Sequence, residues 1–159
     1  VDLLSRGARK RGVTLQRETA DTLPPVRLPE GEVKQVLYNL IQNAVQASPA
    51  GEAVRIRIAA DCDEIAVMVE DRGPGIPDDV LPRIFDPFFS TKTNEAHSGM
   101  GLGLSVSRSV IEALGGRIEV DSRPARGSTF TAVFPTSAET SPHETVDADT
   151  EPDRENPDR

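Results

Sequence analysis

The apolar residues between Glu30 and Ala47 recur with the period of an α-helix. Val33, Val36, Leu37, Leu40, Ile41 and Ala44 stand at i, i+3, i+4, i+7, i+8 and i+11, so they form one stripe. This spacing predicts a helix over 30–47 that packs one face into a core. A second helix is predicted from about 102 to 114, because Gly115 and Gly116 end its apolar pattern.

Runs rich in β-branched and apolar residues predict strands at 13–19, 53–60, 64–70, 117–122 and 128–134. The short polar turn at 61–63 indicates an antiparallel hairpin. Strands grouped with two long helices favour an α+β fold, most simply one mixed sheet with helices on one face. Residues 1–12 are expected to be the end of a connecting helix, 13–136 the folded domain and 137–159 a disordered, proline-containing tail.

Charge and cysteine content exclude several classes of function. The formal net charge is −8, and residues 137–159 carry −6 of it through eight acidic residues and two arginines. The rest is nearly neutral, which argues against nucleic-acid binding. The single cysteine, Cys62, excludes a disulfide framework and suits a reducing compartment. No apolar run reaches the length of a membrane span, so we expect a cytoplasmic domain whose parent protein could be membrane-anchored.

The predicted helix 30–47 carries a second stripe made of amides, namely Gln35, Asn39, Asn43 and Gln46. On its own such a stripe is typical of a solvated helix face. Amide oxygens are also hard neutral ligands that complete the shell of a Mg²⁺ ion already holding phosphate oxygens and waters. The choice between a solvated helix face and a set of metal ligands depends on whether the chain also contains a nucleotide site.

Two glycine-containing segments could form a nucleotide site. The first, 71–75, ends a strand in Asp71 and turns on Gly73 and Gly75, as an ordinary strand exit does. A carboxylate there could also accept a hydrogen bond from the exocyclic amine of adenine, while guanine presents a carbonyl instead. The second segment, GMGLGLS at 99–105, leads into a helix N-terminus, which favours anions.

Lys92 lies between these segments and could reach a terminal phosphate, although a solvated loop lysine is an equally simple interpretation. Phe85, Phe88 and Phe89 are interpreted as packing residues that anchor the loop. The spacing G-x-G-x-G and the lack of G-K-[ST] exclude a P-loop.

In order and spacing, these motifs resemble the sensor histidine kinases. NLIQNA resembles the N box, DRGPG the first glycine box, FDPFFSTK the F box, GMGLGL the second glycine box and GSTF at 127–130 the last element. The amino-acid sequence of these motifs is most similar to that of the nitrogen-regulation and oxygen-sensing kinases. The resemblance covers residues from about 30 to 135 and implies a Bergerat-type two-layer α/β sandwich with a mobile ATP lid.

The resemblance also implies roles for single residues, with ATP and Mg²⁺ as cofactors. Asn43 is implied as the metal ligand, Asp71 as the adenine contact and Thr129 as a support for the water network of Asp71. Asn39 and Lys92 are implied to join Asn43 in catalysis at the phosphates. The remaining positions implied to contact the nucleotide are Gly73, Gly75, Gly99, Gly101, Leu102 and Gly103. Gln46 stands where many of these kinases have a lysine.

The resemblance therefore implies a phosphoryl donor that passes the γ-phosphoryl of ATP to a histidine. Hydrolytic relatives have a glutamate at the position of Asn39, and an amide is no general base, so rapid hydrolysis is not expected. His97 and His143 are not in acceptor-like helices, so the acceptor is expected on a dimerisation domain, in the same or another chain. The parent is expected to be a homodimer that serves a response regulator. The alternatives are a non-catalytic nucleotide-binding scaffold and a true ATPase.

Overall fold

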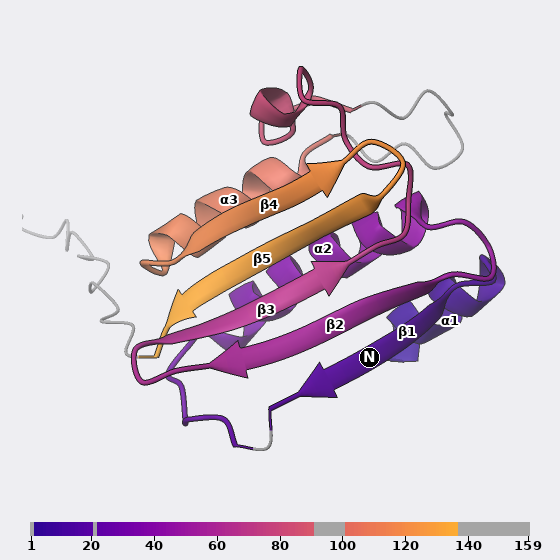
Figure 1. Cartoon of the computed structure of the whole chain (residues 1–159). Helices are drawn as coiled ribbons and strands as arrows, with labels where there is room; N and C mark the ends of the chain where they lie inside the picture. Colours follow the sequence, from indigo (N-terminus) through magenta and orange to yellow (C-terminus); the bar gives the residue numbers. More distant parts are fainter. Residues whose placement is uncertain (1, 21, 91–100, 137–159) are drawn as a thin grey trace, which may run out of the picture.

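The computed structural model describes residues 2–20, 22–90 and 101–136, and within them five strands form one mixed sheet (Figure 1). The strands are β1 (Thr14–Thr19), β2 (Ala53–Ala60), β3 (Glu64–Glu70), β4 (Arg117–Arg123) and β5 (Gly127–Pro135). Their order in the sheet is β1-β2-β3-β5-β4. β1 is parallel to β2 and the other neighbouring pairs are antiparallel. The predicted strands and the predicted hairpin of β2 and β3 are confirmed.

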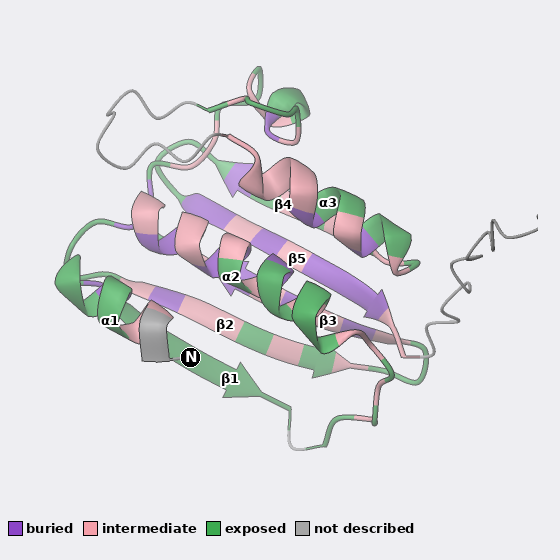
Figure 2. Cartoon of the chain, turned by 180° about the vertical axis from the view of Figure 1, so that it is seen from behind, coloured by how far each residue is buried: buried purple, intermediate pink, exposed green. Residues whose placement is uncertain are grey.

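The helices lie on one face of this sheet (Figure 2). They are α1 (Asp2–Lys10), α2 (Glu30–Ala47) and α3 (Gly103–Ala113), and a short 3-10 helix, η1 (Leu81–Arg83), follows the loop after β3. α2 has the bounds predicted from its apolar stripe. The predicted α+β architecture, a two-layer sandwich of a mixed sheet and helices, is confirmed.

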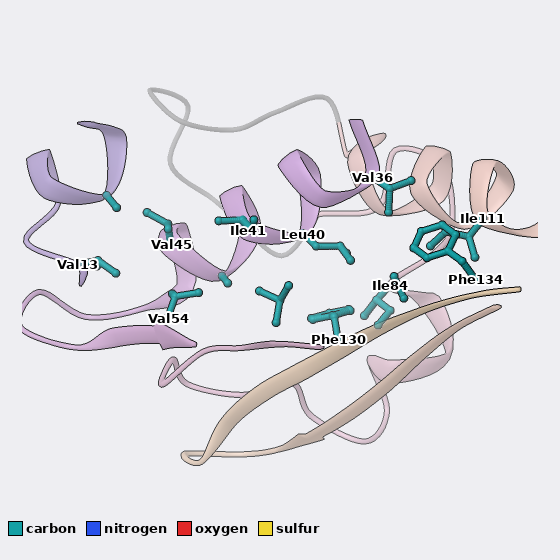
Figure 3. Packing of buried hydrophobic residues seen from close by; sticks show 14 of the residues in the cluster. Val13, Val36, Leu40, Ile41, Val45, Val54, Ile84, Ile111, Phe130 and Phe134 are labelled. Atoms are coloured by element: carbon teal, nitrogen blue, oxygen red, sulfur yellow. The ribbon is translucent and has the colours of Figure 1, made fainter. Parts of the chain in front are cut away.

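The core lies between α2, α3 and the sheet (Figure 3). Val36 and Leu40 of α2 and Ile111 of α3 are fully buried there, against Phe130 and Phe134 of β5. A buried side chain of this size contributes about 1.5–3 kcal/mol through removal from water. Because the apolar stripe of α2 packs on the sheet, the neighbouring amide stripe is held at the side of the helix.

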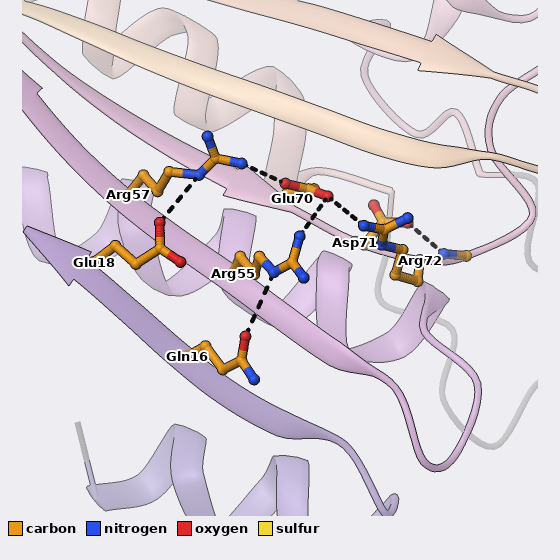
Figure 4. Close-up of polar contacts among 8 residues, drawn as sticks. Gln16, Glu18, Arg55, Arg57, Glu70, Asp71 and Arg72 are labelled. Atoms are coloured by element: carbon orange, nitrogen blue, oxygen red, sulfur yellow. Dashed lines mark hydrogen bonds and ion pairs between the residues drawn. The ribbon is translucent and has the colours of Figure 1, made fainter.

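The opposite face of the sheet carries a network of charged residues around Glu70, the last residue of β3 (Figure 4). Its carboxylate contacts Arg57 at 2.9 Å, Arg72 at 3.3 Å and Arg55 at 3.6 Å. Partly exposed ion pairs of this kind contribute little stability each. Their arrangement places Glu70 on the outer face, and successive residues of an extended chain point to opposite faces. The side chain of Asp71 is accordingly buried on the helix side.

Some of the predictions lie outside the described residues. These are Lys92, Gly99, the part of the expected lid at 91–98 and the tail at 137–159. In the part of the chain that is described, no helix is long and apolar enough to cross a bilayer.

Candidate functional site

A cavity of about 550 Å³ lies between α2, the loop after β3 and the beginning of α3. This volume is typical of small-molecule sites. The cavity brings together seven of the residues that the resemblance implies at the nucleotide or the metal: Asn39, Asn43, Asp71, Gly75, Gly101, Leu102 and Gly103. The rest of its wall is formed by Gln42, Gln46, Ala47, Pro74, Ile76, Pro77, Val80, Ile84, Phe89, Ser90, Leu104, Ser128 and Phe130.

Asp71 is a buried carboxyl group in the wall of this cavity, with 3% of its surface exposed. Its Oδ1 atom accepts a hydrogen bond of 2.8 Å from the backbone N–H of Gly73. Burial raises the pKa of Asp71 above its usual value, although the hydrogen bonds from Gly73 and Ser128 act in the opposite direction. An acceptor held in a largely apolar wall suits a polar ligand group that donates a hydrogen bond.

Glycines allow the loop after β3 to lie close to its neighbours. A Cβ atom on Gly73 would stand 2.8 Å from the backbone oxygen of Ala47. Gly75 has a φ of +70°, and a Cβ there would stand 2.0 Å from the backbone oxygen of Arg123. Gly73 is thus a packing position beneath the cavity, while Gly75 is part of the wall.

The turn between β4 and β5 supports this loop from the other side. The backbone N–H of Ala125 donates to the carbonyl of Pro74 at 2.7 Å, and the N–H of Ile76 donates to Ser122 Oγ at 2.8 Å. Gly127 has a φ of +83°, and a Cβ there would stand 2.0 Å from the backbone oxygen of Asp71. The position of the loop therefore depends on the β4–β5 turn.

Asn39 connects α2 to the first turn of α3. Its Nδ2 atom donates to the carbonyl of Gly103 at 3.3 Å and to Ser107 Oγ at 3.2 Å. Ser107 is fully buried, and its hydroxyl donates to the Gly103 carbonyl at 2.8 Å. The amide of Asn39 thus holds the N-terminus of α3 at the cavity, where the helix dipole and unpaired N–H groups favour an anion.

Asn43 lies one helical turn after Asn39 and also lines the cavity. Among the described residues, no group of three or more His, Cys, Asp or Glu could hold a metal by itself. An amide oxygen fits a Mg²⁺ ion only as one ligand among others, with nucleotide phosphates and waters supplying the rest. The donor set therefore suits a metal that arrives with its nucleotide.

Residues on either side of 91–100 meet at Phe88 and Gly101. The N–H of Phe88 donates to the Gly101 carbonyl at 3.1 Å, and both residues have positive φ values, 64° and 67°. The expectation that Phe88 packs inside is wrong, because 74% of its surface is exposed. Phe85 and Phe89 are partly buried, as expected of packing residues.

Thr129 does not line the cavity. It pairs with Glu70 and Asp121 in the sheet and lines a smaller hollow of about 120 Å³, whose wall also includes Asp71 and Ser128. Its neighbour Ser128 is the cavity residue, and the Ser128 hydroxyl bonds to Asp71. The sequence held a signal for this, since Phe130 is a core residue and residues two apart on a strand share a face.

Comparison with known proteins assigns the family. Residues 29–138 match the HATPase_c family, described as histidine kinase-, DNA gyrase B- and HSP90-like ATPases. The chain belongs to this family. Because the family is described by its ATPases, ATP is the nucleotide that the cavity of this chain is expected to hold.

Individual relatives are sensor histidine kinases, which confirms the predicted resemblance. The domain is 40% identical over 136 residues to the sensor protein FixL of Bradyrhizobium diazoefficiens, an alignment that covers 84% of this chain and 26% of FixL. It also matches the catalytic domain of the histidine kinase ThkA with a TM-score of 0.73 and 33% identity, over 86% of this chain and 88% of that one.

A further solved relative is full-length ShkA in complex with AMPPNP, with a TM-score of 0.75 and 30% identity. The alignment covers 87% of this chain and 29% of ShkA. The first curated relatives are much longer than this HATPase_c domain, which spans 18% to 26% of their length.

Proposed function

We propose that this domain binds ATP with Mg²⁺ and donates the γ-phosphoryl group to a histidine on a separate dimerisation domain. The observation that carries the proposal is one cavity lined by a buried carboxylate, by Asn43 and by the N-terminus of α3. These features suit adenine, the metal and phosphates, respectively. Membership in the HATPase_c family supports the same ligand.

Recognition of the base rests on Asp71. The carboxylate accepts a hydrogen bond from the exocyclic amine of adenine, whereas the carbonyl of guanine at the same place is repelled. Ile76, Val80 and Phe130 supply apolar contact for the ring in the same wall. We therefore expect selectivity for adenine nucleotides.

Recognition of the phosphates rests on the first residues of α3 and on Asn43. Backbone N–H groups at a helix N-terminus bind anionic oxygens, and Gly101, Leu102 and Gly103 bring the backbone to the cavity wall. When bound, Mg²⁺ neutralises charge on the phosphates, and Asn43 is the residue that would ligate it. We also propose phosphate contacts for Lys92 and Gly99, which lie outside the described residues.

Asn39 favours transfer over hydrolysis. Its amide nitrogen donates to Gly103 and Ser107, and an amide does not accept a proton from water at neutral pH. The attacking group is then the acceptor imidazole. Its nitrogen forms a bond to the γ-phosphorus as the bond from that phosphorus to the bridging oxygen breaks, and ADP leaves.

The acceptor histidine belongs in this proposal to a dimerisation domain, in the same polypeptide or another one. Residues 1–12 would be the end of a helix that connects to it, and 137–159 a tail without a role in ATP binding. We further propose that the parent is a homodimer that serves a response regulator, and that this domain works in the cytoplasm.

The test is a calorimetric titration with a non-hydrolysable ATP analogue and its GTP counterpart, each with and without Mg²⁺. We expect binding that is selective for adenine and strengthened by Mg²⁺. The second step is incubation with ATP and a histidine-containing dimerisation domain, followed by detection of acid-labile phosphate. ATP binding without any phosphohistidine on that domain would contradict the donor role, and steady release of inorganic phosphate would indicate an ATPase.

A further inference from the structure

A chain of hydroxyl groups runs from β4 to the buried carboxylate of Asp71. Ser122 of β4 and Ser128 of β5 are buried, and their Oγ atoms are 2.9 Å apart. The Ser128 hydroxyl bonds to Asp71, and the N–H of Asp71 donates to the Ser128 carbonyl at 2.8 Å. Ser122 is therefore connected to Asp71 by two hydrogen bonds, with Ser128 as the intermediate residue.

The direction of these hydrogen bonds follows from the number of protons available. A serine hydroxyl has one hydrogen to donate and two lone pairs. Because the hydrogen of Ser128 goes to the carboxylate, the Ser128 oxygen accepts from Ser122. Ser122 in turn accepts from the N–H of Ile76 at 2.8 Å, and its one hydrogen is shared between Ser128 and the Gly127 carbonyl oxygen, to which the hydroxyl also donates at 3.1 Å.

Ser122 thus acts on two parts of the cavity wall at once. Through Ser128 it fixes the hydroxyl that donates to Asp71, and through Ile76 it fixes the backbone of the loop beside the base site. Ser122 itself is not part of the wall of the large cavity. Its influence on a ligand is therefore indirect.

We propose that Ser122 is a positioning residue for nucleotide selection, which orients the Asp71 carboxylate through Ser128 and the loop through the N–H of Ile76. The inference rests on the proposed binding of an adenine nucleotide in this cavity. It adds a residue from β4, a strand that none of the sequence motifs includes.

The experiment measures the affinities of ATP and GTP by competition against a fluorescent ATP analogue, for wild type and for Ser122→Ala. We expect the preference for ATP over GTP to fall about threefold to tenfold, as for the loss of one hydrogen bond in a buried network. In a Ser128→Ala background the same substitution is expected to have a smaller effect, because the chain to Asp71 is already broken and only the contact with the N–H of Ile76 is still lost.

Ser48→Ala is the matched control. Ser48 is equally buried, and its hydroxyl donates to the Ala44 carbonyl within α2, outside the network. We expect its nucleotide preference to equal that of wild type. Ser122→Cys, which keeps the side-chain volume with a weaker hydrogen-bonding group, is the second variant should Ser122→Ala not fold, and the same drop is expected.

An unchanged preference in Ser122→Ala or Ser122→Cys would overturn the inference. So would an equal weakening of both nucleotides with a lower melting temperature, which is the signature of a purely structural role. The outcome that refutes the proposed function is different, namely a wild-type domain that does not prefer ATP, and it would remove the inference with it.

Discussion

Asn39 on α2 and Ser107 on α3 are joined by a hydrogen bond of 3.2 Å, donated by the amide nitrogen to the buried hydroxyl. The bond connects the helix that carries the proposed metal ligand with the helix whose N-terminus is proposed to bind the phosphates. This contact between side chains therefore links the two sides of the cavity. Its removal is expected to affect folding and ligand binding together.

Ser107→Ala removes the hydroxyl that accepts from Asn39 and donates to the Gly103 carbonyl. We expect the free energy of unfolding to fall by about 1–2 kcal/mol, the cost of breaking hydrogen bonds in a buried site. Urea denaturation checks this. The control is Ser105→Ala on the same helix, whose partly buried hydroxyl donates to the Leu102 carbonyl at 3.0 Å, and a loss as large as that of Ser107→Ala would contradict the prediction.

Asn39→Asp replaces the amide by a carboxylate of the same shape. The ionised group cannot donate to the Gly103 carbonyl, so the two oxygens repel each other, and we expect a loss of about 1–3 kcal/mol at neutral pH. Because protonation restores a donor, the carboxyl group of the variant binds its proton more tightly in the folded state. Stability relative to wild type should therefore recover as pH falls, and a difference independent of pH would refute this explanation.

Asp71 predicts a pH dependence of stability. Its folded-state pKa is raised by burial, so between the unfolded and folded pKa values the native state binds more protons than the unfolded state. The contribution of Asp71 to stability therefore decreases as pH rises through that window. Asp71→Asn removes this slope. Urea titrations at several pH values compare the two proteins, and parallel curves would contradict the raised pKa.

The same substitution separates stability from binding. Asp71→Asn replaces the carboxylate that is proposed to accept from the adenine amine by a neutral amide, and we expect affinity for an ATP analogue to fall at least about tenfold. At neutral pH the variant is expected to be as stable as wild type, because a buried charge no longer has to be desolvated. Calorimetric titration gives the affinity. Tight ATP binding by the variant would contradict the role proposed for Asp71.

Substitution by alanine is expected to change the free energy of unfolding in opposite directions at Gly75 and at Gly31. In Gly75→Ala the new Cβ would stand 2.0 Å from the Arg123 carbonyl at a φ of +70°, so we expect a loss of at least about 1–3 kcal/mol. Gly31 lies in α2, where a new Cβ would have no neighbouring atom within 4 Å, and Gly31→Ala should stabilise by about 0.5–1 kcal/mol. Thermal unfolding measures both, and equal shifts would show that the close approach is absent.

Local patterns in the sequence predicted the elements of this fold, because period and capping signals act within a few residues. α2 is the clearest case, since six apolar positions in register define its length and its buried face. The place of β5 between β3 and β4 was not predictable in this way. It depends on which strands pair over long range, and no local pattern encodes that choice.

The candidate site was predicted only in part. Residues within local motifs were found, and residues whose role depends on distant contacts were not. Asp71, Asn43 and Gly103 lie in motifs, and the cavity contains all three. Ser107 and Ser122 were missed, because their importance comes from contacts with residues far away in the chain. Phe88 was expected inside, but its positive φ and its backbone bond to Gly101 accompany an exposed ring.

The place of β5 has a consequence for synthesis at the ribosome. Among the described strands β4 pairs with β5 alone, and β5 completes the sheet beside β3, so neither can join the sheet until the chain has been made through Pro135. Ser128 and Phe130 of the cavity wall are added in that same step. A nascent chain that stops earlier lacks a closed nucleotide site, and ATP binding therefore distinguishes finished domains from unfinished ones.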